Sequence, residues 1–150
     1  LEAFGNATTV RNNNSSRFGK YMEIQFSLGG APVGGCVTNY LLEKPRVVSP
    51  GGGERNFHIF YMLTAASAAG HALAAPLQLG ADASYHYLVR DGGDPKVEGR
   101  DDLDEFETVA TALQSLGVRS RWQRSFRLEK SQRYPILMCP RLGIGWFSAV

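Results

Sequence analysis

The sequence predicts an α/β domain, because strand-like and helix-like patterns follow one another along the chain. Residues 21–28 alternate polar and apolar side chains with a period of two, which is typical of a half-buried strand. Residues 36–42 form a second strand-like run, and residues 54–70 and 101–117 place apolar side chains at helical spacing. We therefore expect two antiparallel strands followed by two helices.

A polar block precedes the first predicted strand. Residues 1–5 are expected to form the last turn of a helix, which Gly5 and Asn6 end. Residues 12–20 then carry three amides, two hydroxyls and one guanidinium. Hydroxyl oxygen suits Mg²⁺, and amide and guanidinium N–H groups donate to phosphate oxygens. The block therefore predicts a loop that contacts a metal-bound phosphate. A plain turn or a glycosylated loop is the alternative, since Asn-x-Ser/Thr sequences occur here.

The two predicted strands are joined by the glycine-rich residues 29–35, a spacing that favours an antiparallel hairpin with a long loop. Charged residues follow the second strand. For Glu43, Lys44 and Arg46 we expect a solvated strand end rather than a catalytic role.

The first predicted helix begins near Glu54 and ends near Gly70. Its residues at positions 57, 60, 61 and 64 share one face, and an aromatic stripe at this spacing is usually core. His58, in the same helix, is expected to be a packed histidine. The three histidines of the chain lack ligand neighbours at metal-site spacing, so no zinc site is predicted.

The second predicted helix opens with five acidic residues among its first seven. Carboxylates stabilise the positive end of a helix dipole, so capping is the expected role of this cluster rather than metal binding. The apolar stripe of the helix consists of Leu103, Phe106, Ala110, Leu113 and Leu116, and Gly117 ends it.

The composition is that of an ordinary globular domain. The 150 residues are 43% hydrophobic and 20% charged, and the net charge of +2 favours neither a nucleic acid nor a membrane as partner. The two cysteines are too few for a disulfide framework, which favours a reducing compartment and counts against glycosylation.

The charge is unevenly distributed. Residues 1–117 contain 9 Lys/Arg and 13 Asp/Glu, a net charge of −4, whereas residues 118–150 contain 7 and 1, a net charge of +6. Helical periodicity ends at the same place, and prolines interrupt the basic segment. We expect residues 118–150 to be a divergent basic tail that is out of frame or disordered, in preference to a nucleic-acid patch.

Three stretches carry a resemblance to a known family. The block Asn-Asn-Asn-Ser-Ser-Arg-Phe-Gly-Lys (12–20) resembles switch I of the myosin motor domain, whereas kinesins continue Ser-Ser-Arg with Ser-His. Residues 1–7 resemble the end of the preceding myosin helix, and residues 53–61 resemble a second myosin signature. The resemblance covers residues 1–117, and the wording of residues 34–44 is most similar to class-one myosins.

The resemblance implies a fragment of a P-loop NTPase motor domain that hydrolyses ATP with Mg²⁺ and moves on actin. By the resemblance, Ser16 is the Mg²⁺ ligand, and Ser15 contacts the γ-phosphate and the attacking water. Asn12 bonds the phosphates, and Arg17 pairs with a glutamate of a later loop that is expected to lie outside this chain. The chain is expected to lack the phosphate loop, so whether it is an enzyme by itself stays open.

The resemblance further implies calmodulin-like light chains on a lever outside this chain, and a cytoplasmic place on the actin cytoskeleton. Two alternatives remain at this point. One is a kinesin-like or other switch-type nucleotide hydrolase, and the other is a non-enzymatic binding module.

Overall fold

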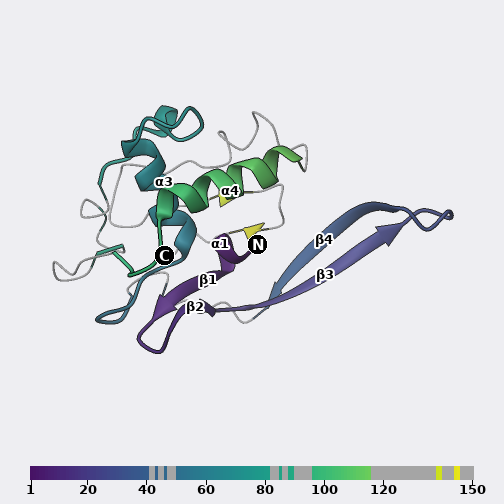
Figure 1. Ribbon diagram of the computed structural model, residues 1–150. Helices are drawn as coiled ribbons and strands as arrows, with labels where there is room; N and C mark the ends of the chain where they lie inside the picture. The colour runs from purple at the N-terminus through teal and green to yellow at the C-terminus, as the bar shows by residue number, and fades with distance from the viewer. Residues whose placement is uncertain are drawn as a thin grey trace.

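The computed structural model describes residues 1–40, 43, 46, 50–81, 85, 88–89, 96–115 and two short strands near the C-terminus. Its helices and strands follow one another along the chain in the order drawn in Figure 1. They are α1 (Glu2–Gly5), β1 (Asn6–Thr9), β2 (Asn12–Ser16), β3 (Gly19–Phe26), β4 (Pro32–Tyr40), α3 (His58–Ala68), η1 (Ala75–Leu77), α4 (Asp102–Ser115), β5 (Met138–Cys139) and β6 (Ile144–Gly145).

The core lies around α3, which packs against both α1 and α4 (Figure 1). Phe57 and Tyr61 are fully buried, as is Phe106 from α4. Phe60 and Thr64 are also buried, so the predicted aromatic face of the first helix is confirmed as core. The Tyr61 hydroxyl donates to the Leu88 carbonyl over 2.9 Å and ties a distant segment to this core.

The polar block, predicted to be a loop, forms strand β2. It pairs antiparallel with β1, with Asn6 opposite Ser16 and Ala7 opposite Ser15. The loop prediction is wrong for residues 12–16, because the backbone of β1 offers a hydrogen-bonding edge that local composition does not reveal.

Helix α3 starts at His58, four residues after the predicted start at Glu54. The preceding residues pair with β1 instead: the Arg55 amide donates to the Thr8 carbonyl over 3.0 Å, and Phe57 forms a bridge with Ala7. Phe57 keeps the extended backbone of a bridge residue, with φ −59° and ψ 140°, and this conformation is incompatible with a helix, so the helix begins at His58.

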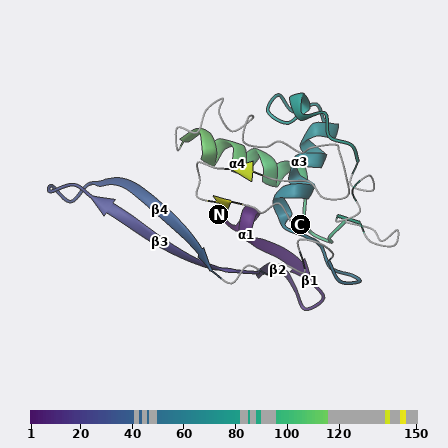
Figure 2. The ribbon, with the colours of Figure 1, turned by 180° about the vertical axis from the view of Figure 1, so that it is seen from behind.

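The predicted antiparallel hairpin is confirmed as the pair β3–β4, with Glu23 opposite Cys36. Strand β4 begins at Pro32, so the connection is shorter than predicted. The expectation of a half-buried strand is wrong: Met22, Ile24 and Phe26 are 56%, 58% and 61% exposed. The hairpin projects away from the helices (Figures 1 and 2), although strand β6 contacts β4 and Val37 of β4 lies beside Leu1 and Phe4.

Helix α4 confirms the capping role of its acidic start. The Asp101 carboxylate accepts hydrogen bonds from the amides of Leu103 and Asp104 over 2.9 and 3.2 Å. Phe106, Ala110 and Leu113 are buried as predicted, whereas Leu116 lies outside the described residues.

The predicted tail, residues 118–150, also lies outside the described residues except for the antiparallel backbone pair β5–β6. Within the described ranges, every helix is too short or too polar to span a membrane.

Candidate functional site

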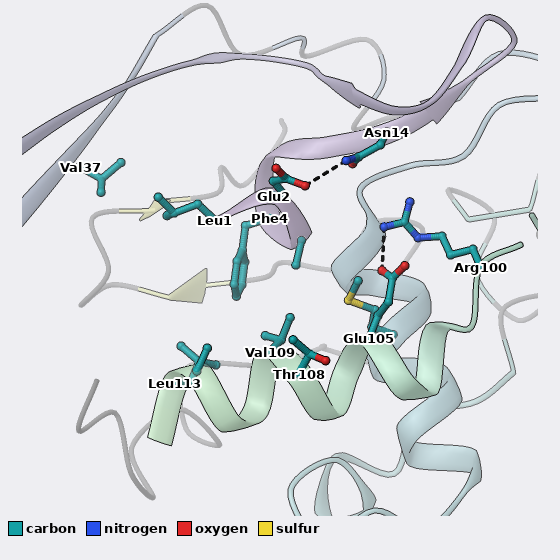
Figure 3. A pocket seen from close by; sticks show the side chains of 13 residues that line it. Leu1, Glu2, Phe4, Asn14, Val37, Arg100, Glu105, Thr108, Val109 and Leu113 are labelled. Atoms are coloured by element: carbon teal, nitrogen blue, oxygen red, sulfur yellow. Dashed lines mark hydrogen bonds and ion pairs between the residues drawn. The ribbon is translucent and has the colours of Figure 1, made fainter. Parts of the chain in front are cut away.

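Side chains from three other segments of the chain contact strand β2. Asn6 of β1 donates from Nδ2 to Asn14 Oδ1 over 3.1 Å. Asn14 donates from its own Nδ2 to Glu2 Oε2 over 2.9 Å, as Figure 3 shows. Arg100 donates from Nη1 to the Asn13 carbonyl over 3.1 Å. These contacts position the polar block against the helical core.

His58 lies beneath this strand, at the start of α3. Its Nε2 is 3.1 Å from Asn14 Oδ1 and 3.1 Å from Arg100 Nη1. Burial, followed by the positive charges of Arg100 and Arg55, lowers the pKa of His58 to about 3. A neutral imidazole has one donor nitrogen and one acceptor nitrogen, so Nε2 makes one of the two hydrogen bonds at a time. The prediction of a packed histidine is confirmed.

The two serines of the block have different surroundings. Ser15 is partly buried, and its Oγ accepts a hydrogen bond from Arg17 Nη1 over 3.2 Å. Ser16 is exposed, and its Oγ donates to the Phe18 carbonyl over 3.3 Å. Side chains alternate along a strand, so the structure brings Ser15 and Arg17 together on one side. Ser15 keeps its own proton to donate, and Ser16 keeps its oxygen lone pairs.

Asn12 begins the strand and is exposed. Its Oδ1 accepts a hydrogen bond from the Asn14 amide over 2.9 Å, and its carbonyl accepts one from the Thr9 hydroxyl over 3.0 Å. Both contacts shape the turn between β1 and β2. None of the hydrogen bonds among the described residues joins Asn12 to Ser15 or Ser16.

Arg17 is held by Glu43, a partner that the sequence did not indicate. Arg17 Nε and Nη2 donate to the two carboxylate oxygens of Glu43 over 2.7 and 2.8 Å. Arg46 Nε donates to Glu43 Oε2 over 2.7 Å, and Arg46 Nη2 donates to Glu54 Oε2 over 2.8 Å. The Arg17 hydrogen bond, together with Arg46, lowers the pKa of Glu43 to about 2. The four side chains form a continuous ion-pair chain.

The expectation of a solvated strand end is therefore wrong for Arg46, since only 6% of its side chain is exposed, whereas Glu43 keeps 31% exposure but is bound by both arginines. Lys44 lies outside the described residues. Arginine fits this buried position because its fork satisfies several acceptors at once. The i,i+3 spacing of Glu43 and Arg46 was the one local signal of the pair, but such pairs usually lie on a surface.

A pocket of about 590 Å³ lies beside the strand, between α1 and α4 (Figure 3). Its wall is mostly apolar, with Phe4, Met62 and Leu113, and Asn14 is its one residue from the polar block. Neither Ser15 nor Ser16 lines it, so this pocket is separate from the predicted phosphate contacts. The described residues contain no cluster of three or more His, Cys, Asp or Glu that could hold a metal.

Comparison with known proteins identifies the family. A family profile described as "Myosin head (motor domain)" matches residues 1–129. The match extends beyond Gly117, and the separate nature of residues 118–150 stays a prediction.

The chain is 53% identical over 129 residues to the myosin IC heavy chain of Acanthamoeba castellanii. It is 56% identical over 118 residues to unconventional myosin-Ib of Mus musculus, and 54% identical over 129 residues to the myosin ID heavy chain of Dictyostelium discoideum. The aligned segments cover 85%, 78% and 85% of this chain but only 10–11% of the relatives. The predicted similarity to class-one myosins is confirmed, and the family match is to myosin rather than to kinesin. The chain belongs to the myosin head (motor domain) family.

Proposed function

We propose that this chain supplies switch I of an ATP-driven motor that moves on actin. Family membership supports the motor, and the geometry of the polar block supports its place at the nucleotide. The chain spans about a tenth of the length of the relatives it matches, so ATP hydrolysis belongs to a complete head with the P-loop NTPase fold. The observation that carries the proposal is the hydrogen bond from Arg17 Nη1 to Ser15 Oγ.

That hydrogen bond uses Ser15 as an acceptor and leaves its O–H free to donate. A hydroxyl donor at this place suits a γ-phosphate oxygen or the attacking water. We assign contact with both groups to Ser15. Arg17 adds positive charge next to it, and charge placed in advance of the reaction is the main way a protein accelerates phosphoryl transfer. Arg17 is proposed to meet a carboxylate from a later loop of the complete head as the site closes.

Ser16 fits a Mg²⁺ ligand. Its proton is engaged by the Phe18 carbonyl, so its oxygen lone pairs remain available, and the residue is exposed. When bound, Mg²⁺ neutralises charge on the phosphates of ATP. The Ser16 hydroxyl would supply one ligand of a bound Mg²⁺, and other groups of the complete head would supply the rest. Asn12 is assigned to the phosphates through its amide N–H groups.

In the complete motor, we propose actin filaments and calmodulin-like light chains as partners, with no nucleic acid. The proposed location is the cytoplasm, on the actin cytoskeleton. Light chains bind a lever outside the aligned segment, and actin is contacted largely by other parts of the head.

The assignment is tested with Ser16→Ala and Arg17→Ala in a complete motor head that contains this chain. Each variant is expected to lower ATP hydrolysis by about 10²–10³-fold, the usual cost of one preorganised charge-stabilising group. Arg17→Ala should retain ATP binding but fail to close the site, whereas Ser16→Ala should alter the Mg²⁺ dependence of hydrolysis.

Quenched-flow measurement of the hydrolysis step and actin-activated turnover are the readouts. Ser115→Ala at the exposed end of α4 removes the same hydroxyl group from a remote position and serves as the control. Normal turnover in Ser16→Ala or Arg17→Ala would remove the site assignment and favour the binding-module alternative.

A further inference from the structure

The ion-pair chain that reaches switch I contains one buried member. Arg46 is the buried member, and its side chain makes three contacts: with Glu43, with Glu54 and, from Nη1, with the Arg55 carbonyl over 3.1 Å. A guanidinium held by three acceptors has little freedom to move. Glu43 Oε2, 2.7 Å from Arg46 Nε, is therefore fixed by a rigid neighbour.

Glu43 transmits this rigidity to Arg17. The carboxylate receives Arg17 Nε and Nη2 in a two-point fork, which fixes the plane of the guanidinium as well as its distance. The third nitrogen, Nη1, then lies 3.2 Å from Ser15 Oγ. Only the side of the guanidinium away from Glu43 remains open to Ser15 and to an incoming group.

An arginine side chain without such a partner samples many rotamers, and ordering it costs free energy when the site closes. The side chain of Arg17 is 26% exposed, so it remains in contact with water, and its side-chain hydrogen bonds go to Glu43 and Ser15. The pairing with Glu43 removes this ordering cost before a nucleotide arrives.

We infer that Glu43 is a positioning residue for ATP hydrolysis: it holds Arg17 so that Nη1 faces Ser15 and the site of closure. The inference rests on the proposed function, because it gives Arg17 a role in hydrolysis. Glu43 does not touch the nucleotide in this arrangement and acts through Arg17 alone.

The experiment is a double-mutant cycle in the complete motor head, with Glu43→Gln, Arg17→Ala and the double variant. Glu43→Gln retains the shape of the side chain and removes its charge. We expect the hydrolysis-step rate constant in single-turnover quenched flow to fall about three- to tenfold, in the range of a partly exposed, charge-assisted pair. KM for ATP should stay unchanged. In the Arg17→Ala background, Glu43→Gln should have no further effect.

Two further variants control for folding and for charge. Glu43→Asp keeps the charge but shortens the side chain by one methylene, which withdraws the carboxylate from Arg17, so it should slow hydrolysis in the same way. Glu23→Gln removes an exposed carboxylate on β3 and should match the parent head.

The outcomes separate this inference from the proposed function. Normal hydrolysis in Arg17→Ala would overturn the proposed function and the inference with it. Impaired Arg17→Ala together with unaffected Glu43→Gln would overturn the inference alone. Equal slowing by Glu43→Gln in both backgrounds would show a general structural role and would also overturn it.

Discussion

Single buried residues in this chain have protonation states that their surroundings determine. His58 is fully buried and faces two cations, Arg55 and Arg100, while the carboxylate of Glu105 pairs with Arg100 over 2.7 Å. The imidazole is therefore neutral in the folded chain at neutral pH. Neutral His58 contacts Asn14, so its protonation state affects how strand β2 is held against the core.

The buried His58 predicts that the stability of the chain depends on pH. The folded-state pKa of His58 is about 3, against an ordinary value of 6.5 in the unfolded chain. Between these values the unfolded chain binds more protons, so the free energy of unfolding falls as the pH is lowered. From pH 7 to pH 5 the loss from this one group is about 2 kcal/mol. Urea unfolding at several pH values should show that the free energy of unfolding depends less steeply on pH in His58→Gln than in the parent chain. Identical slopes for the two proteins would contradict this prediction.

Elements are joined in this fold by a few polar contacts between residues far apart in the sequence. Arg55 precedes α3, and its Nη2 is 2.9 Å from both carboxylate oxygens of Asp102, at the start of α4. Its guanidinium also stacks over the Tyr61 ring, 3.7 Å from the centroid. Only 4% of the Arg55 side chain is exposed, so the charge depends on Asp102 for compensation.

The ion pair between Arg55 and Asp102 is expected to stabilise the fold. Asp102→Asn should lower the free energy of unfolding by about 3 kcal/mol, because removal of one partner leaves a buried charge unpaired. Asp104→Asn is the matched control: it lies in the same first turn and loses the same interaction with the helix dipole, but it is exposed. The control should change stability by less than about 0.5 kcal/mol in the same urea titration. Equal effects of the two variants would show that the dipole, not the ion pair, stabilises the start of α4.

The described part of the molecule consists of a helical body, the short β1–β2 pair and the long β3–β4 hairpin (Figure 2). Among the described strands, β3 pairs only with β4, so each strand has a free edge. The hairpin exposes apolar side chains, and near its tip Leu28 is fully exposed and Val33 is largely exposed. Free edges and exposed apolar side chains together favour pairing between molecules.

The exposed hairpin predicts that copies of the chain associate with one another. The isolated chain should self-associate through this hairpin, and Ile24→Lys should raise the concentration at which association begins. The expected increase is about fivefold or more, which corresponds to roughly 1 kcal/mol of apolar burial. Val10→Lys, at a 74% exposed position between β1 and β2, adds the same charge elsewhere. Sedimentation velocity over a concentration series is the measurement, and an equal effect of both lysines would point to net charge instead of the hairpin.

Features that depend on neighbouring residues could be predicted from the sequence. The alternation in residues 21–28, the helical spacing of Phe57, Phe60 and Tyr61, and the acidic start of α4 all led to the observed element types. Each of these signals is a local periodicity or cap, and the chain satisfies it within a few residues. The family was also evident from sequence, because its motifs are contiguous.

Features that depend on distant partners were decided only by the tertiary structure. Residues 12–16 form a strand because β1 pairs with them, and α3 starts late because Phe57 bridges Ala7. Glu43 was assigned to solvent because its partner Arg17 lies 26 residues away, and no periodicity connects the two. The exposure of β3 has the same origin: alternation specifies two faces, but whether either is covered depends on what the rest of the molecule places against it.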